Sequence, residues 1–203
     1  TVTVRTEETE TIMVLSPHAQ HDTHATTRRG GWSTRRISVT ALLCALSFIM
    51  TFVEIPIFPP APWLEYDPSG IVAFVAALAF GPGTGAIVVV LPWVLKTLFS
   101  FNVWGHLMAI VANLALILPA ALVARRVRGT RGLVVGMVVG GLVSLVASIL
   151  CNLVVTPLYT EVGIADVIAM IVPILLPFNL IKIILNCVVT GLVQRPLSQA
   201  LSA

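Results

Sequence analysis

Four polar side chains stand within long apolar runs of the sequence, and these are the residues best suited to binding chemistry. They are Lys96, Asn152, Asn179 and Lys182. A polar group is costly in hydrocarbon, so each is expected to face the interior of a helix bundle or a wet cavity. Asn179 and Lys182 are three residues apart, which places them on one face of a helix. Amides both donate and accept hydrogen bonds, whereas lysine only donates. The set therefore suits a flat, neutral ligand edged with carbonyls and ring nitrogens.

Three of these residues also have a structural interpretation. The two lysines could extend their ammonium groups to the lipid headgroups, and Asn152 could bridge two helices. For Lys182 we favour binding, because a cation near a helix N-terminus opposes the helix dipole. For Lys96 both interpretations stay open.

A proline-rich loop precedes the second apolar run and could cover such a ligand. It reads Phe58-Pro59-Pro60-Ala61-Pro62-Trp63-Leu64-Glu65-Tyr66-Asp67. Trp63 or Tyr66 could lie against a ligand ring. Alternatively, both aromatics belong to the belt that marks a membrane interface.

Catalytic and metal-binding signatures are missing from the sequence. The glycine-rich stretch at residues 81–85 lacks the Lys-Ser/Thr pair of a phosphate-binding loop, and neither H-E-x-x-H nor G-x-S-x-G occurs. His18, His21 and His24 have no Cys or carboxylate at ligand spacing to complete a metal set. We therefore predict neither an enzyme nor a metal site. No carboxylate stands in the middle of an apolar run, which argues against a proton-coupled carrier.

The composition shows what kind of element must position these residues. Of 203 residues, 57% are hydrophobic and only 10% are charged, against about 25% charged in soluble domains. With a mean hydropathy of +0.99, a soluble globule would expose a largely apolar surface. The sequence therefore predicts an all-α integral membrane protein in the lipid bilayer. The net charge of +3 then reflects membrane orientation, and we expect no nucleic-acid partner.

The apolar runs predict six transmembrane helices. The runs cover residues 37–53, 69–101, 105–124, 132–155 and 167–193. The second run is too long for one helix, and the Gly-Pro-Gly cluster at residues 81–83 is expected to divide it. In the last run, Pro173 and Pro177 would disrupt a continuous helix. We therefore expect a short outer segment at 166–176 and a sixth span at 177–194.

Charge placement sets the expected orientation. If the chain reverses at residues 81–85, Arg195 and the run Arg125, Arg126, Arg128 and Arg131 all face the cytoplasm, as the positive-inside rule requires. The outer loops then carry acids and no arginine. This predicts six spans with both the N- and C-termini cytoplasmic. Residues 1–36 are polar and are expected to form a disordered cytosolic N-terminal tail, followed by a six-helix domain at 37–203.

Several short motifs in this sequence resemble one family. Pro177-Phe178-Asn179-Leu180-Ile181-Lys182 is similar to the Pro-Phe-Asn-Leu-x-Lys stretch of the riboflavin-specific substrate-binding (S) components of energy-coupling factor (ECF) vitamin transporters. Further matches are the alanine pair Ala41 and Ala45, the stretch Phe80-Gly81-Pro82-x-x-Gly85-Ala86, and Asn152 followed by Pro157-x-Tyr159. The resemblance runs from about residue 35 to the C-terminus.

The resemblance implies a function, partners and site residues. It implies an S component in a prokaryotic plasma membrane that captures riboflavin from outside and docks on a transmembrane coupling subunit with two ATP-binding subunits. Asn152, Asn179 and Lys182 would bond the isoalloxazine ring, while residues near Trp63 and Leu64 would close the site. Ala41 and Ala45, a small-xxx-small pair, would lie on the docking surface. Whether FMN is also accepted stays open, as does the role of Lys96.

Three alternatives remain. The chain could be an S component for another vitamin, because this architecture serves several vitamins and a fold does not fix a ligand. It could also be a stand-alone secondary carrier, although no inverted repeat is visible, or a structural membrane protein without a ligand.

Overall fold

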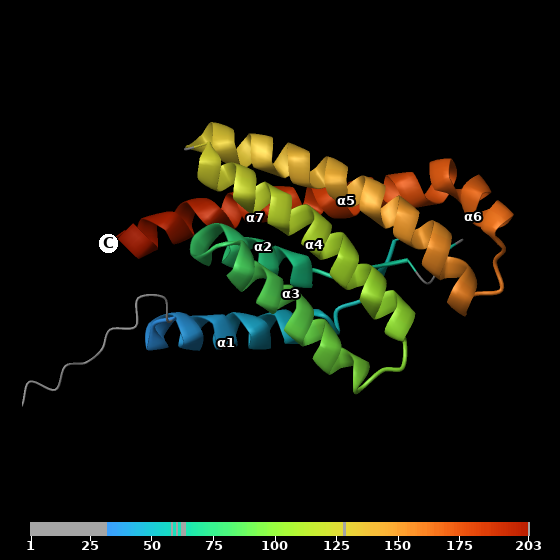
Figure 1. Cartoon of the computed structure of the whole chain (residues 1–203), viewed down its shortest axis with the longest axis horizontal. Coiled ribbons are helices and arrows are strands. Elements are labelled where there is room, and N and C mark those ends of the chain that lie inside the picture. Colours follow the sequence, from blue (N-terminus) through green and yellow to red (C-terminus); the bar gives the residue numbers. More distant parts are fainter. Residues whose placement is uncertain (1–31, 58, 60, 62–63, 128, 203) are drawn as a thin grey trace, which may run out of the picture. The chain divides into compact units, whose positions relative to one another are not determined.

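The computed structural model describes residues 32–202 apart from 58, 60, 62, 63 and 128. This part is mostly helical (Figure 1). Its helices are α1 (Thr34–Met50), α2 (Ser69–Phe80), α3 (Pro82–Thr97), α4 (Val103–Arg126), α5 (Thr130–Tyr159), α6 (Ile164–Met170), the π-helical turn η1 (Ile171–Leu175) and α7 (Leu176–Ser202). The predicted disordered tail falls mainly on residues 1–31, which lie outside the described residues. Helix α1 begins at Thr34, earlier than the predicted start at residue 37, and Ser33 caps it by accepting a hydrogen bond from the Arg36 amide.

The prediction of a purely helical fold misses one short β-ladder. Strands β1 (Ile55–Pro56) and β2 (Glu65–Tyr66) pair antiparallel in the loop between α1 and α2, with Ile55 opposite Tyr66 and Pro56 opposite Glu65. The ladder ties the two ends of the proline-rich loop together. It thereby fixes where the loop side chains point.

The predicted break in the second apolar run is confirmed. Helix α2 ends at Phe80 and α3 begins at Pro82, with Gly81 between them at φ 106°, a conformation that favours glycine. Pro82 suits the first position of a helix. Gly85 lies so close to Ala77 that an added Cβ would stand 2.4 Å from the Ala77 Cβ. The two helices therefore fold back on each other as a tightly packed hairpin.

Among the residues that the structure describes, three helical segments are long and apolar enough to cross a membrane. They are Val103–Arg126, Thr130–Leu158 and Ile164–Gln194. In the last segment, α6 and η1 precede α7, which begins at Leu176, close to the predicted division at 176–177. The expected interruption by Pro173 and Pro177 is absent, because helical backbone runs through both residues. Pro173 lies in η1, and the wider π turn changes the hydrogen-bond pattern where proline lacks an N–H. Helices α2 and α3 are shorter apolar helices.

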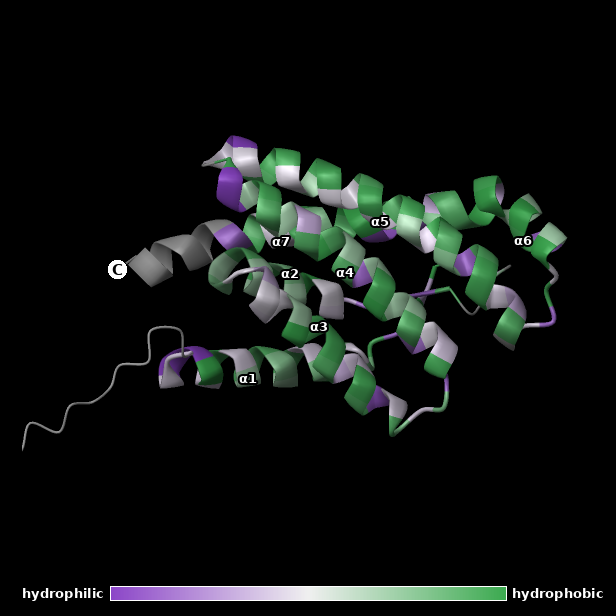
Figure 2. Cartoon of the chain, viewed as in Figure 1, coloured by the Kyte–Doolittle hydropathy of each residue, from purple (hydrophilic) through white to green (hydrophobic). Residues whose placement is uncertain are grey.

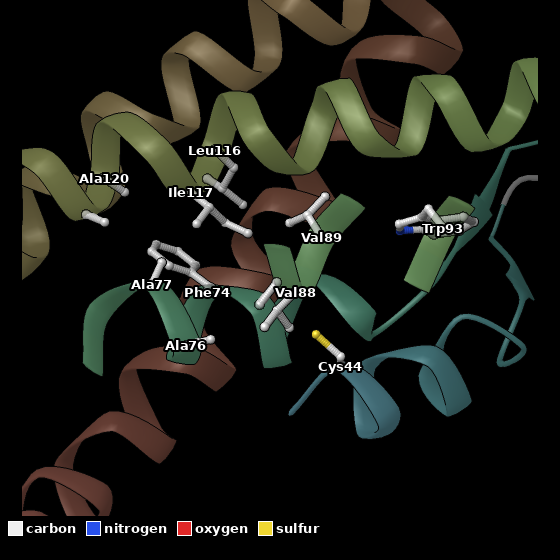
Figure 3. Packing of buried hydrophobic residues seen from close by; sticks show 12 residues of the cluster. Cys44, Phe74, Ala76, Ala77, Val88, Val89, Trp93, Leu116, Ile117 and Ala120 are labelled. Atoms are coloured by element: carbon white, nitrogen blue, oxygen red, sulfur yellow. The ribbon is translucent and has the colours of Figure 1, made fainter. Parts of the chain in front are cut away.

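The main core lies where α1 to α4 meet. Phe74 of α2, Val88 of α3 and Ile117 of α4 are fully buried there, with Cys44 of α1 beside them (Figure 3). On the outside, large apolar side chains remain exposed, including Leu142, Val146, Leu150 and Val154 along one stripe of α5. Figure 2 shows that hydrophobic residues cover most of the long helices, while polar residues gather near the helix ends. Such a stripe is suited to contact with lipid chains rather than water.

Candidate functional site

One cavity of about 390 Å³ collects most of the predicted site residues. Its lining comes from the loop between α1 and α2 and from α3, α4, α5 and α7, and includes Leu64, Lys96, Asn152, Asn179 and Lys182. The expected convergence of the two amides and Lys182 on one hollow is therefore confirmed. The volume lies within the range of about 300 to 1,000 Å³ typical of small-molecule sites.

The two asparagines come from α5 and α7, and their amides are anchored to their own helices. Asn152 Nδ2 donates to the Ser148 carbonyl oxygen at 2.8 Å, and its Oδ1 accepts from Thr156 Oγ1 at 3.2 Å. Asn179 Nδ2 donates to the Leu175 carbonyl oxygen at 2.8 Å. Each amide carries two N–H donors and a carbonyl oxygen. Anchoring through one N–H fixes the orientation of the amide and leaves the second N–H for another acceptor.

Lys182 is held in place by a carboxylate from the loop. Its Nζ lies 2.9 Å from Asp67 Oδ2, and only 11% of the Lys182 side chain and 4% of the Asp67 side chain are exposed. Asp67 also accepts a hydrogen bond from the Ser69 hydroxyl. Burial raises the pKa of Asp67, but the Lys182 ammonium and the Ser69 hydroxyl together outweigh burial, so the pKa lies below its ordinary value. The buried pair connects the loop to α7.

Lys96 of α3 forms a second ion pair at the cavity. Its ammonium contacts the Glu54 carboxylate and the Thr51 carbonyl oxygen, and stands 4.9 Å from the centre of the Trp93 ring. Lys96 is only 2% exposed. Because both lysines are buried at the cavity, the interpretation that they extend to the lipid headgroups is wrong.

The loop covers the cavity through Leu64 rather than through Tyr66. Leu64 is buried, lines the cavity and packs in one cluster with Phe178 of α7. Tyr66 is 7% exposed, and its hydroxyl lies 3.3 Å from Asn186 Oδ1, so it neither belongs to an interfacial belt nor lines this cavity. Successive strand residues point to opposite faces, which explains why Glu65 lines the cavity and Tyr66 anchors the loop. Trp63 lies outside the described residues.

Sequence reasoning missed several residues of the site. Neither Asp67 nor Glu54 was predicted at the site, and His106 was not singled out. The His106 ring nitrogens lie 2.9 Å from Thr97 Oγ1 and 3.1 Å from Ser100 Oγ, and the ring packs on Trp93. The available signal was the cost of burying lysine, which requires a nearby carboxylate. Which carboxylate serves which lysine depends on contacts between residues 42 and 115 positions apart.

No metal-binding group of three or more His, Cys, Asp or Glu side chains occurs within the described residues. The cavity offers hydrogen-bond donors and acceptors from its amides, ion pairs and hydroxyls. Apolar walls come from Leu64, Trp93, Met108, Ala109 and Phe178. This arrangement can bind a flat, largely apolar molecule with a polar edge.

Comparison with known proteins places the chain in a family. A family model described as "ECF transporter, substrate-specific component" matches residues 35–193. The chain is 32% identical over 103 residues to the riboflavin transporter RibU of Staphylococcus aureus, covering 50% of this chain and 54% of that protein. It is 29% identical over 106 residues to the riboflavin transporter FmnP of Bacillus subtilis, covering 50% of this chain and 55% of that protein. The matches thus span about half the length of these relatives.

A solved structure agrees with these sequence matches. The structure described as "Structure and mechanism of the S component of a bacterial ECF transporter" superposes with a TM-score of 0.73 and 29% sequence identity. The match covers 83% of this chain and 98% of the other. The chain belongs to the family of substrate-specific components of ECF transporters.

Proposed function

We propose that this protein binds riboflavin in the 390 Å³ cavity and is the riboflavin-specific S component of an ECF transporter. The observation that carries the proposal is that Asn152, Asn179 and Lys182 line one cavity with apolar walls. The two relatives named above are riboflavin transporters, which favours this vitamin over others.

The chemistry of the flavin ring matches that of the cavity. The pyrimidine edge of isoalloxazine carries two carbonyl oxygens, a ring nitrogen and one imide N–H. Lys182 donates one of its three N–H groups to Asp67 and has two more for the ring carbonyls. The amides of Asn152 and Asn179 can donate to a carbonyl and accept from the imide. Trp93 and Phe178 supply aromatic walls for the ring system.

Colour and fluorescence test the proposal directly. The protein purified in detergent from riboflavin-containing medium should be yellow with flavin absorbance. Protein freed of ligand should quench the fluorescence of added riboflavin to a one-to-one end point. Thiamine and biotin, which lack the isoalloxazine ring, serve as competitors that should not displace the flavin. A colourless protein that leaves riboflavin fluorescence unchanged would refute the assignment and favour another vitamin or a stand-alone carrier.

We also propose a multi-pass placement in a prokaryotic cell membrane, with α1, α2, α3, α4, α5 and α7 as six spans and both termini in the cytoplasm. In support, Arg36 donates to the Phe80 carbonyl oxygen at 2.9 Å, and the Arg125 guanidinium lies beside Gly81. The start of α1, the turn between α2 and α3 and the end of α4 thus gather arginines together, as expected for a cytoplasmic end. Residues 1–36 would then extend into the cytosol.

Single cysteines test this orientation. In a variant whose native cysteines are replaced by serine, a cysteine at Glu161 should react with a membrane-impermeant maleimide in intact cells. A cysteine at Thr130 should react only after the membrane is permeabilised. The opposite pattern would invert the proposed orientation.

The surface of α1 that carries Ala41 and Ala45 is proposed to dock on the coupling subunit, which works with two ATP-binding subunits. Both alanines are exposed, whereas Thr40, Cys44 and Ser47 face the bundle. The small pair is therefore not used in packing within the described bundle and leaves room for close approach of another helix.

Bulky substitutions on α1 test the docking surface. Replacing Ala41 and Ala45 by leucine should abolish uptake and co-purification of the partner subunits, while riboflavin binding persists. The matched control replaces Ala165 and Ala169, an equally spaced and exposed pair on α6, and should keep both properties. Loss of riboflavin binding in the α1 variant would mean that the pair supports the fold instead.

A further inference from the structure

The cavity has a second polar side that the ring-binding residues do not explain. Glu54 and Glu65 line it from the α1 to α2 loop, Lys96 from α3, and Asn102 from the cap of α4. The ring-binding asparagines and Lys182 come instead from α5 and α7. A flavin whose ring edge bonds α5 and α7 would direct its polyol chain away from them, toward other parts of the lining.

The charges that line the cavity do not balance. The described lining contains three carboxylates, Glu54, Glu65 and Asp67, and two ammonium groups, Lys96 and Lys182. Three negative charges and two positive charges leave a net charge of −1, with His106 not counted. Lys96 is paired with Glu54, and Lys182 is paired with Asp67. Glu65 is therefore the carboxylate without a counter-ion of its own among these groups.

The β-ladder keeps Glu65 at this position. Glu65 lies in β2 directly opposite Pro56, and Glu54 precedes β1, two residues from Pro56. Both carboxylates line the cavity. Burial raises the pKa of Glu65, the Glu54 carboxylate raises it further through its charge and a side-chain hydrogen bond, and Lys96 lowers it. Lys96 and Glu54 are in contact, and all three charged groups line the cavity. An anion in the cavity would meet two carboxylates there and an ammonium group that Glu54 already binds.

We propose that Glu65 is a specificity-determining residue that makes the cavity select neutral riboflavin over its phosphate ester, FMN. The inference rests on the proposed function. A phosphate monoester carries a charge of about −1.5 to −2 at pH 7, and a like charge placed against a carboxylate opposes binding. Because Lys96 is already occupied by Glu54 and the Thr51 carbonyl oxygen, it does not provide a free counter-ion for the phosphate.

The test measures Kd for riboflavin and for FMN with the purified full-length protein, using quenching of flavin fluorescence at pH 8 and 0.15 M salt. The wild type should bind riboflavin at least about tenfold more tightly than FMN. In Glu65→Gln, which keeps the side-chain shape and removes the charge, the ratio of the two Kd values should fall several-fold. Glu161→Gln makes the same change in net charge at an exposed residue outside the cavity lining, and its ratio should match that of the wild type.

Three results would separate the possible failures. Equal affinities for riboflavin and FMN in the wild type would overturn the inference while leaving the proposed function intact. An equal fall in the ratio for Glu65→Gln and Glu161→Gln would also overturn it, because overall charge would then explain the selection. A wild type that binds neither flavin would refute the proposed function itself. If Glu65→Gln does not fold, the ratio of the two Kd values is measured for the wild type at 0.02 and 0.5 M salt. Screening should reduce an electrostatic preference, so the ratio should be smaller at 0.5 M salt, and an unchanged ratio would overturn the inference.

Discussion

The buried pair formed by Lys182 and Asp67 should behave as one coupled unit, which a double-mutant cycle can test. Its Nζ to Oδ2 distance is 2.9 Å, and both side chains are nearly excluded from solvent. Removing one partner leaves the other charge buried and uncompensated, which typically costs about 3 to 5 kcal/mol. Replacing both partners removes both charges and often leaves the stability of the fold nearly unchanged. The pair also connects the loop over the cavity to α7, so the same changes should affect ligand capture.

The cycle uses Asp67→Asn, Lys182→Met and the double variant, which keep side-chain size while removing charge. We expect each single variant to lower the free energy of unfolding by about 3 kcal/mol, and the double variant to be more stable than the sum of the single changes predicts. The assay is reversible unfolding in mixed detergent micelles, followed by circular dichroism. The exposed control Glu161→Gln should change stability by no more than about 0.5 kcal/mol.

Two results would refute this reasoning. Single variants that each cost less than about 1 kcal/mol would place the pair in the range of exposed ion pairs. Strictly additive effects would mean that Asp67 and Lys182 do not interact. Riboflavin affinity gives an independent readout, because Lys182→Met removes a proposed ring donor, whereas Asp67→Asn removes only the group that positions it.

The remaining predictions concern the ring site, helix packing and pH. Asn179→Ala should weaken riboflavin binding by about 1 to 3 kcal/mol, since a buried polar group of the ligand loses its partner; calorimetric titration checks this, and unchanged affinity would remove Asn179 from the site. Gly85→Ala should destabilise the fold by about 1 to 3 kcal/mol, because the new methyl group would overlap Ala77. Gly83→Ala is the control for this change, because no atom lies within 4 Å of its Cβ position, and equal losses in both variants would contradict the packing argument. The pKa of Asp67 is lowered in the folded state, so the stability that its charge contributes is fully present above the unfolded carboxyl pKa of about 3.9 and is lost as pH falls below it toward the folded value. The difference in unfolding free energy between the wild type and Asp67→Asn should therefore be constant from about pH 5 to 8, and a decline already between pH 7 and 5 would contradict this sign.

The sequence alone was sufficient to predict the helical class, the break at Gly81 and the convergence of Asn152, Asn179 and Lys182. These predictions depend on local properties: apolar run length, the backbone preferences of Gly and Pro, and the cost of isolated polar groups in hydrocarbon. A buried asparagine or lysine side chain needs other polar groups around it. The spacing of these residues along the apolar runs therefore predicts that they lie near one another.

Only the tertiary structure decided which groups pair with one another. The partners of both lysines lie in one loop whose fold depends on a two-residue β-ladder, and apolar periodicity does not predict such a short element. The same ladder turned Tyr66 away from the cavity and Glu65 toward it. The continuous path through Pro173 depends on a π turn, which the proline pattern alone does not predict. Long-range pairing depends on how the helices and the loop pack in space, and hydrophobic patterning specifies their faces but not their partners.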